Sequence, residues 1–208
     1  MIAADSWRLI GDVHPSEQAL ILRRGRDRIE SSFCNWGYPA KEQGGLVINA
    51  RAETLLEKPL FCEDTLHRHG LKTVMVTGGL ATVETCERLR GKIDAMNIDL
   101  KAFSDRFYKE LIGGDRRMVM DFIECAHSFA HIELTCLIIP GENDDPEEMD
   151  AMAGWIASLP GGKEIPLHVS RFFPRYHMQD RPPTDVDRVY ALAETAAKHL
   201  KYVYTGNC

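Results

Sequence analysis

The chain of 208 residues is 44% hydrophobic and 27% charged, which are ordinary globular values and argue against a disordered protein. Its longest apolar runs are too short to span a bilayer, and no cationic start followed by an apolar stretch indicates a signal peptide. The net charge of −6 disfavours the basic surface that duplex DNA binding usually needs. The six cysteines are spread along a chain long enough not to need disulfides, so we expect reduced thiols and a cytoplasmic location.

Short β-prone runs characterise the first third of the chain. Gln18 to Arg23 and Ile29 to Trp36 are joined by a Gly-Arg-Asp turn, which favours a β-hairpin. A third short strand is expected at Leu46 to Ile48, and a brief helix at Glu53 to Leu56. So few strands make a marginal sheet, and we therefore predict a small β-rich segment over residues 1–69.

The runs GDVHPS, NWGY and INARAET, followed by EKPLF, resemble the SRAP family over about residues 8–68. Members of that family capture abasic sites in single-stranded DNA through a thiazolidine link to an N-terminal cysteine. The resemblance implies that Asn49 positions the abasic sugar and that Arg51 holds a phosphate through its bidentate guanidinium. It also implies a stacking face at Trp36, for which a place in the core is the alternative interpretation. Since the chain starts Met1-Ile2 and the later Glu and His segments of SRAP are missing, we expect no crosslinking.

From residue 70 onward, strands alternate with helices, which is typical of βαβ units and a parallel sheet. The expected strands cover residues 71–77, 94–100, 131–139, 165–170 and 201–204. The expected helices cover residues 82–89, 118–129 and 185–199, with two more beginning after Ser104 and at the Asp144 to Glu148 run. The fold class predicted for residues 70–208 is therefore α/β, either a partial (β/α) barrel or an open parallel sheet.

Polar side chains alternate along two of these strands. Asn97, Asp99 and Lys101 share one face of their strand, although both faces of a central parallel strand are normally apolar. A carboxylate followed two residues later by an ammonium is suited to a cation and a ligand carboxylate, and an internal ion pair is the alternative. His168 and Ser170 also share a face, so His168 is a candidate ligand group, although a lone histidine is more often structural.

Two further segments, a glycine turn and an acidic run, each allow a functional and a structural interpretation. Thr77, Gly78 and Gly79 follow a buried strand, and the glycines would allow a ligand to approach backbone amides; an ordinary strand-to-helix turn is the alternative. The acidic run Asp144 to Glu148 contains Pro146 and is interpreted as a helix start rather than a metal site, because early acids suit the amide end of a helix.

Several runs between residues 70 and 208 resemble, in order, the radical SAM protein of the AmmeMemoRadiSam system, which is itself similar to glycyl-radical-enzyme activases. These runs are VTGGLATVETCERL, IDAMNIDLKAFSDRFYKELIGG, ELTCLIIPGENDDPEEMDAMAGWI, PLHVSRFFPRYHMQDRPPT and YVYTGN. The resemblance implies a partial (β/α) barrel and a [4Fe–4S] cluster that cleaves S-adenosylmethionine. It implies that Lys101 and His168 contact S-adenosylmethionine, with Asp99 and Thr77 near a cation or the same ligand. Gly79 and Gly78 belong to the same cofactor-binding set, and Gly78 stands where the family usually has Asn.

The cluster motif Cys-x-x-x-Cys-x-x-Cys of that family does not occur in this sequence. The closest cysteines, Cys125 and Cys136, are expected on a helix and a strand and are interpreted as core residues. Three hypotheses follow. The first is a catalytically incomplete radical SAM protein that binds S-adenosylmethionine, with or without a second chain that completes the cluster. The second is a non-crosslinking binder of single-stranded or abasic DNA, and the third is a recombined or frame-joined gene product with neither activity.

Overall fold

The computed structural model describes residues 72–208 in full, and before them the backbone of four strands at residues 18–24, 29–35, 38–39 and 46–47. The chain divides into two compact units, residues 1–59 and 60–208. The strands of the first unit are β1 (Gln18–Arg24), β2 (Ile29–Asn35), β3 (Tyr38–Pro39) and β4 (Leu46–Val47). β1 pairs antiparallel with β2, which confirms the predicted hairpin, and β3 pairs antiparallel with β4. The helix expected at Glu53 to Leu56 lies outside the described residues.

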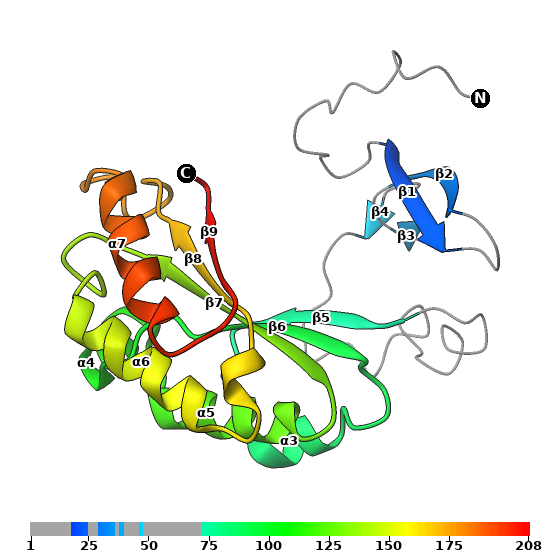
Figure 1. The fold of residues 1–208 in the computed structure, drawn as a ribbon, viewed down its shortest axis with the longest axis horizontal. Coiled ribbons are helices and arrows are strands. Elements are labelled where there is room, and N and C mark those ends of the chain that lie inside the picture. The colour runs from blue at the N-terminus through cyan, green and yellow to red at the C-terminus, as the bar shows by residue number, and fades with distance from the viewer. Residues whose placement is uncertain (1–17, 25–28, 36–37, 40–45, 48–71) are drawn as a thin grey trace. The chain divides into compact units, whose positions relative to one another are not determined.

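A five-stranded parallel sheet in the order β5-β6-β7-β8-β9 forms the second unit (Figure 1). Its strands are β5 (Val74–Thr77), β6 (Ala95–Asp99), β7 (His131–Ile138), β8 (Leu167–Arg171) and β9 (Val203–Gly206). The main helices are α3 (Val83–Glu87), α4 (Asp105–Phe107), α5 (Arg116–His127), α6 (Pro146–Ser158) and α7 (Val186–Ala197). A π-turn at Tyr108–Ile112 extends α4, and a 3₁₀ turn spans Gly162–Glu164. The predicted α/β class with an open parallel sheet is confirmed.

The helices begin where capping side chains can accept the free amide N–H groups of a first turn. Asp115, Asp145 and Asp185 cap α5, α6 and α7, each through its own carboxylate. Ser104 caps α4 as expected, by accepting from the amide of Phe107. The acidic run before α6 is therefore a helix start, as the sequence indicated, because Asp145 accepts from the amide of Glu147 and Pro146 follows it directly.

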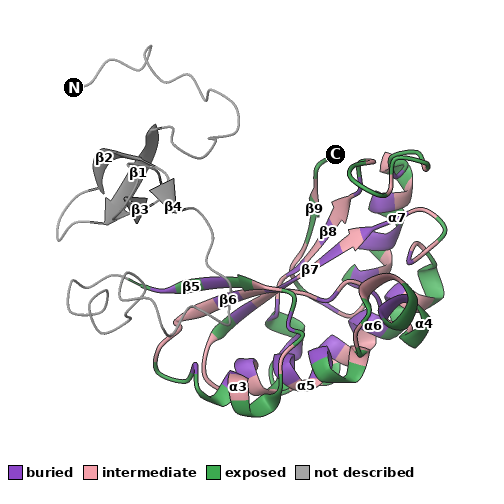
Figure 2. Ribbon diagram, turned by 180° about the vertical axis from the view of Figure 1, so that it is seen from behind, coloured by how far each residue is buried: buried purple, intermediate pink, exposed green. Residues whose placement is uncertain are grey.

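The five helices cover one face of the sheet (Figure 1). Buried and less buried residues alternate along β6 and β7, as the burial colours of Figure 2 indicate. Because successive side chains of a strand point to opposite faces, the buried set lies on the face that the helices cover. Ile98, Leu134 and Val169 are fully buried there, together with Phe122 and Ile123 of α5. On the other face, Val74 and Val76 of β5 are 68% and 75% exposed. Within residues 72–208, no helix packs on this second face, which is called the open face below.

Candidate functional site on the open face

Polar side chains of neighbouring strands gather on the open face. The strand register pairs Asp99 with Thr135, Thr135 with His168, and His168 with Tyr204, so these four residues form one row across the sheet. A second row begins one pleat repeat earlier, where Asn97 is paired with Glu133. Because both faces of parallel sheets are usually apolar and covered, a polar face of this kind indicates a binding surface.

Asp99 and Lys101 form an ion pair at the carboxyl end of β6, with Lys101 Nζ 2.7 Å from Asp99 Oδ2. Their side chains are 29% and 34% exposed, so the pair is only partly withdrawn from water. The internal ion pair that the sequence left open is thus present. An ion pair with this exposure is held weakly enough for a ligand to exchange partners with it.

The backbone of Lys101 is fixed by buried polar groups. The amide N–H of Lys101 donates to the hydroxyl of Tyr108, at 3.2 Å, and burial raises the pKa of Tyr108 to about 12. The side-chain amide of Asn143, which is 3% exposed, donates to the carbonyls of Lys101 and Leu137, at 2.5 Å and 2.9 Å. Its oxygen accepts from the amide of Ile139, at 2.7 Å. Asn143 thereby joins the chain after β6 to the chain after β7. The backbone from which the Lys101 side chain extends is therefore held in place.

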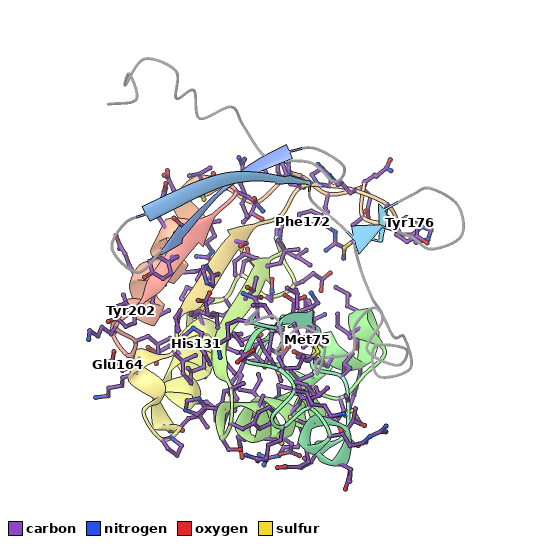
Figure 3. The ribbon with its side chains drawn as sticks, turned by 90° about the vertical axis from the view of Figure 1, so that its right-hand side faces the viewer. Met75, His131, Glu164, Phe172, Tyr176 and Tyr202 are labelled. Carbon is purple, nitrogen blue, oxygen red and sulfur yellow. The ribbon has the colours of Figure 1, made fainter. Side chains whose placement is uncertain are left out.

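Glu133 lies between two imidazoles. Its Oε2 is 2.7 Å from Nε2 of His168, and its Oε1 is 3.4 Å from Nε2 of His131. Hydrogen bonding to His168 is the main cause that lowers the pKa of the Glu133 carboxyl, with a smaller part from His131. The rings of His168 and Tyr204 are 5.5 Å apart at 31°. Figure 3 marks His131 at the amino end of β7, away from Phe172, which directly follows β8.

Packing inside the protein accounts for Gly79 in the turn after β5, and a closely approaching ligand is not needed to explain it. Gly79 has φ +67°, and a Cβ there would lie 3.0 Å from Ile98 Cγ2 and 3.2 Å from Val119 Cγ1. Its amide donates to the Thr77 hydroxyl, at 3.2 Å. A Cβ on Gly78 would meet nothing within 4 Å, so this glycine leaves open space beside the turn.

The described cysteines do not fit a [4Fe–4S] cluster. Cys86 and Cys136 are buried, Cys125 is half-buried and Cys208 is exposed. Burial raises the pKa of the Cys136 thiol to about 12, although a cluster ligand must be a thiolate. Within residues 72–208, no three His, Cys, Asp or Glu side chains are grouped so that they could hold a metal ion. Cys136 is a core residue as predicted, whereas Cys125 is only half-buried.

The structure brings Asp99 and Lys101 into contact and places His168 in the same row across the sheet, with Thr135 between it and Asp99. Trp36, Asn49 and Arg51 lie outside the described residues. Sequence reasoning missed Glu133, although its signal was present, since His131, Glu133 and Thr135 alternate with apolar residues along one strand. It also missed Asn143, because nothing in the sequence shows which loop carbonyls a single asparagine will reach.

The model of the Radical SAM superfamily matches residues 42–153, which is more than half of the chain, and the chain therefore belongs to this superfamily. The match begins within the segment whose motifs resemble SRAP. Membership implies S-adenosylmethionine as a small-molecule partner and a [4Fe–4S] cluster as a cofactor. In the described part of the chain, no helix has the length and apolarity that a membrane crossing requires.

A curated relative, an uncharacterized protein of Methanocaldococcus jannaschii, is 35% identical over 141 residues. That alignment covers 67% of this chain and 41% of the relative, so the chain spans well under half of the relative's length. Among solved structures, a domain of a pyruvate-formate lyase-activating enzyme from Bacteroides vulgatus matches with a TM-score of 0.60 and 20% identity. This match covers 76% of the chain and 96% of that domain, which shows the same fold.

Proposed function

We propose that residues 72–208 bind S-adenosylmethionine on the open face, at the carboxyl end of the sheet. The observation that carries this proposal is the polar row made by Asp99, Thr135, His168 and Tyr204, on the face that the described helices leave uncovered. Ligands of open α/β sheets bind at the carboxyl ends of the strands, which is where this row and Lys101 lie.

The charges on this face complement the ligand. The methionine part of S-adenosylmethionine carries a carboxylate, an ammonium and a sulfonium. Lys101 suits the carboxylate and Asp99 suits a cationic group, so a bound ligand would replace one ion pair, 2.7 Å long here, with two. Thr77 is the last residue of β5 and is paired with the buried Ile98, so its side chain starts on the helix side of the sheet. It is proposed as a further contact to the same ligand or to a cation only from the carboxyl end of the strand.

His168 is proposed to contact the ligand through its remaining ring nitrogen. Glu133 engages Nε2, which leaves Nδ1 as the atom for a ligand hydroxyl or amine. Glu133 is then a positioning residue, because it sets the orientation of the imidazole without touching the ligand. Gly78 and Gly79 complete the proposed set, with Gly78 providing open space beside the strand end.

We further propose that this chain by itself lacks the groups needed for radical initiation. The Cys-x-x-x-Cys-x-x-Cys motif is absent from the sequence, and the four described cysteines do not fit a cluster. Binding of S-adenosylmethionine and its reductive cleavage are therefore separable here. Anaerobic reconstitution with iron and sulfide should give no stoichiometric four-iron absorbance and no 5′-deoxyadenosine; a full cluster with reductive cleavage would contradict this part of the proposal.

Equilibrium dialysis with labelled S-adenosylmethionine tests the binding proposal. Lys101→Ala and His168→Ala should each weaken binding about tenfold or more, since each removes one hydrogen bond to a polar or charged group. Matched controls are Lys201→Ala, whose ammonium pairs with Glu164 at 3.1 Å, and His199→Ala, whose ring pairs with Asp150 at 2.8 Å. Absence of saturable binding, or equal losses in the controls, would refute the proposal.

The alternative function is binding of single-stranded or abasic DNA by residues 8–68, through Trp36, Asn49 and Arg51. The resemblance of the INARAET run to SRAP supports it. Retention of an abasic oligonucleotide that falls with salt, and that Arg51→Ala weakens, would favour this function, because phosphate contacts release counterions. Retention equal for Arg51→Ala and the parent chain would exclude the role assigned to Arg51.

A further inference from the structure

A cavity of about 420 Å³ lies at the carboxyl ends of β7 and β8, and none of the residues of the proposed S-adenosylmethionine site lines it. Its walls come from the loop after β7, the last residue of β8, the segment before α7 and the first turn of α7. The residues that line it are Pro140, Asp144, Arg171, Pro182, Pro183, Thr184, Asp185 and Arg188. Successive strand residues point to opposite faces, so Arg171 faces the helix side whereas Ser170 faces the open side.

The walls of the cavity are held rigidly. Thr184, which is 1% exposed, donates its hydroxyl hydrogen to the carbonyl of Ile138, at 2.5 Å, and accepts from the amide of Phe172, at 3.2 Å. This one side chain ties the segment before α7 to the ends of β7 and β8. Three prolines line the same cavity and restrict the backbone further. A cavity preorganised in this way can bind a ligand with little ordering cost.

Two guanidinium groups line this cavity, and each has N–H donors that make no hydrogen bond within residues 72–208. Arg171 donates from Nε to the carbonyl of Thr184, at 2.7 Å, and its guanidinium carbon lies 4.7 Å from the ring of Phe173. Its two terminal nitrogens make no hydrogen bond within residues 72–208. Arg188 is 40% exposed, and its Nε is 3.9 Å from Asp144 Oδ2, which is too far for a hydrogen bond. Planar guanidinium groups with free donors match the two oxygens of a carboxylate or a phosphate.

The two aspartates of the cavity each accept a hydrogen bond from a backbone amide. Asp185 accepts from the amide of Asp187 and caps α7, and Asp144 Oδ1 accepts from the amide of Gly141, at 2.9 Å. The lining carries two arginines and two aspartates, so it is electrically balanced. A balanced lining gives no extended positive field for a polyanion such as a nucleic acid, so an anionic group would be held by the guanidinium donors alone.

From these observations we propose that the cavity is a second ligand site, which binds a small molecule through a single carboxylate or phosphate group held by Arg171 and Arg188. The volume exceeds that of the anionic group alone and falls within the range of small-molecule sites, so it also admits part of the body that carries the group. The site does not depend on S-adenosylmethionine, since none of its lining residues belongs to the proposed S-adenosylmethionine site and Arg171 faces the helix side.

Calorimetric titration of the full chain with inorganic phosphate, and separately with succinate, tests this site and identifies the source of the anion. At least one anion should bind saturably at one site per chain in chloride-free buffer. Arg188→Gln should weaken that binding about tenfold or more, whereas Arg117→Gln, which removes a guanidinium paired with Asp121 on α5, should not. Binding of only one of the two anions supports the site and assigns its ligand class.

A variant that binds the anion more tightly makes the test independent of folding defects, because a misfolded protein would lose affinity. Asp144→Asn keeps an oxygen for the amide of Gly141 but removes the negative charge beside Arg188, so anion binding should strengthen several-fold. All three variants should bind S-adenosylmethionine as the parent chain does, which separates this proposal from the preceding one. No saturable binding of either anion, or equal affinities in the parent chain, Arg188→Gln and Asp144→Asn, would overturn the inference.

Discussion

Glu133 and His168 meet diagonally across two adjacent strands, with His168 Nε2 at 2.7 Å from Glu133 Oε2. The register partner of His168 is Thr135, and Glu133 lies one pleat repeat before it. Thr135 is itself engaged, since its hydroxyl donates to Asn97 Oδ1, at 2.9 Å. The diagonal contact turns the imidazole along the strand and, within residues 72–208, leaves His168 Nδ1 without a hydrogen-bond partner.

Replacing His168 should raise the pKa of Glu133. The hydrogen bond from His168 is the largest cause that holds this pKa below its ordinary value, so His168→Ala should return it towards that value. A carbon-detected NMR titration of the glutamate carboxyls measures the change. His199→Ala, which removes the equivalent partner of Asp150, is the control. A Glu133 pKa that does not move in His168→Ala would show that the contact is absent in solution.

The same contact predicts how stability depends on pH. The folded-state pKa of Glu133 is depressed, so its contribution is complete above the pKa of an unfolded glutamate and is lost as the pH falls through the folded-state value. Because Glu133 is 38% exposed, the contribution should be at most about 1 kcal/mol. Urea unfolding across this acidic range should show a smaller loss for Glu133→Gln than for the parent chain. Parallel losses would contradict the prediction.

Removal of the Asn143 side-chain amide should destabilise the backbone conformation of Lys101. Asn143→Ala leaves the carbonyl of Lys101 and the amide of Ile139 without their side-chain partner, which should cost about 1–3 kcal/mol in the free energy of unfolding. Binding of S-adenosylmethionine should weaken as well. The exposed Asn207, whose amide is 3.5 Å from the carbonyl of Arg171, is the matched control. Equal urea midpoints for Asn143→Ala and Asn207→Ala would refute the anchoring role.

The hydroxyl of Thr184 should matter more than its methyl group. Thr184→Val fills similar space but strands the carbonyl of Ile138 and the amide of Phe172, so it should cost about 1–3 kcal/mol. Thr184→Ser keeps both hydrogen bonds and should cost less. Thermal and urea unfolding of the two variants distinguish these outcomes, and a serine variant less stable than the valine variant would contradict the assignment.

Shortening a side chain to alanine should destabilise the protein much more on the helix-covered face of the sheet than on the open face. Leu134→Ala removes a fully buried side chain from β7 and should cost about 2–5 kcal/mol, because a cavity remains in the core. Val76→Ala removes a side chain that is 75% exposed on the open face and should change stability by about 0.5 kcal/mol or less. A large loss in Val76→Ala would show that the open face is covered in solution.

Periodicity and capping signals were sufficient to predict the α/β class, all five strands of the parallel sheet and the start of α6 at Pro146. Element ends were less predictable, because hydrogen-bonded pairing rather than local preference decides where strands such as β5 begin. Alternation along each strand indicated the polar faces that carry Asp99 and His168, which lie in one row with Thr135 of β7 between them. It did not identify Asn143 as the residue that holds the backbone of Lys101, since that contact depends on how loops after two different strands approach each other.

Gly79 sets the distance between the turn after β5 and two apolar side chains, Ile98 of β6 and Val119 of α5. Ile98 is adjacent in sequence to Asp99, so any enlargement at position 79 would be transmitted as a displacement of the carboxylate beside Lys101. Gly78 occupies the same turn without this constraint. Two consecutive glycines that look interchangeable in the sequence should therefore differ sharply in mutational tolerance, and a saturation library across this turn would reveal that asymmetry directly.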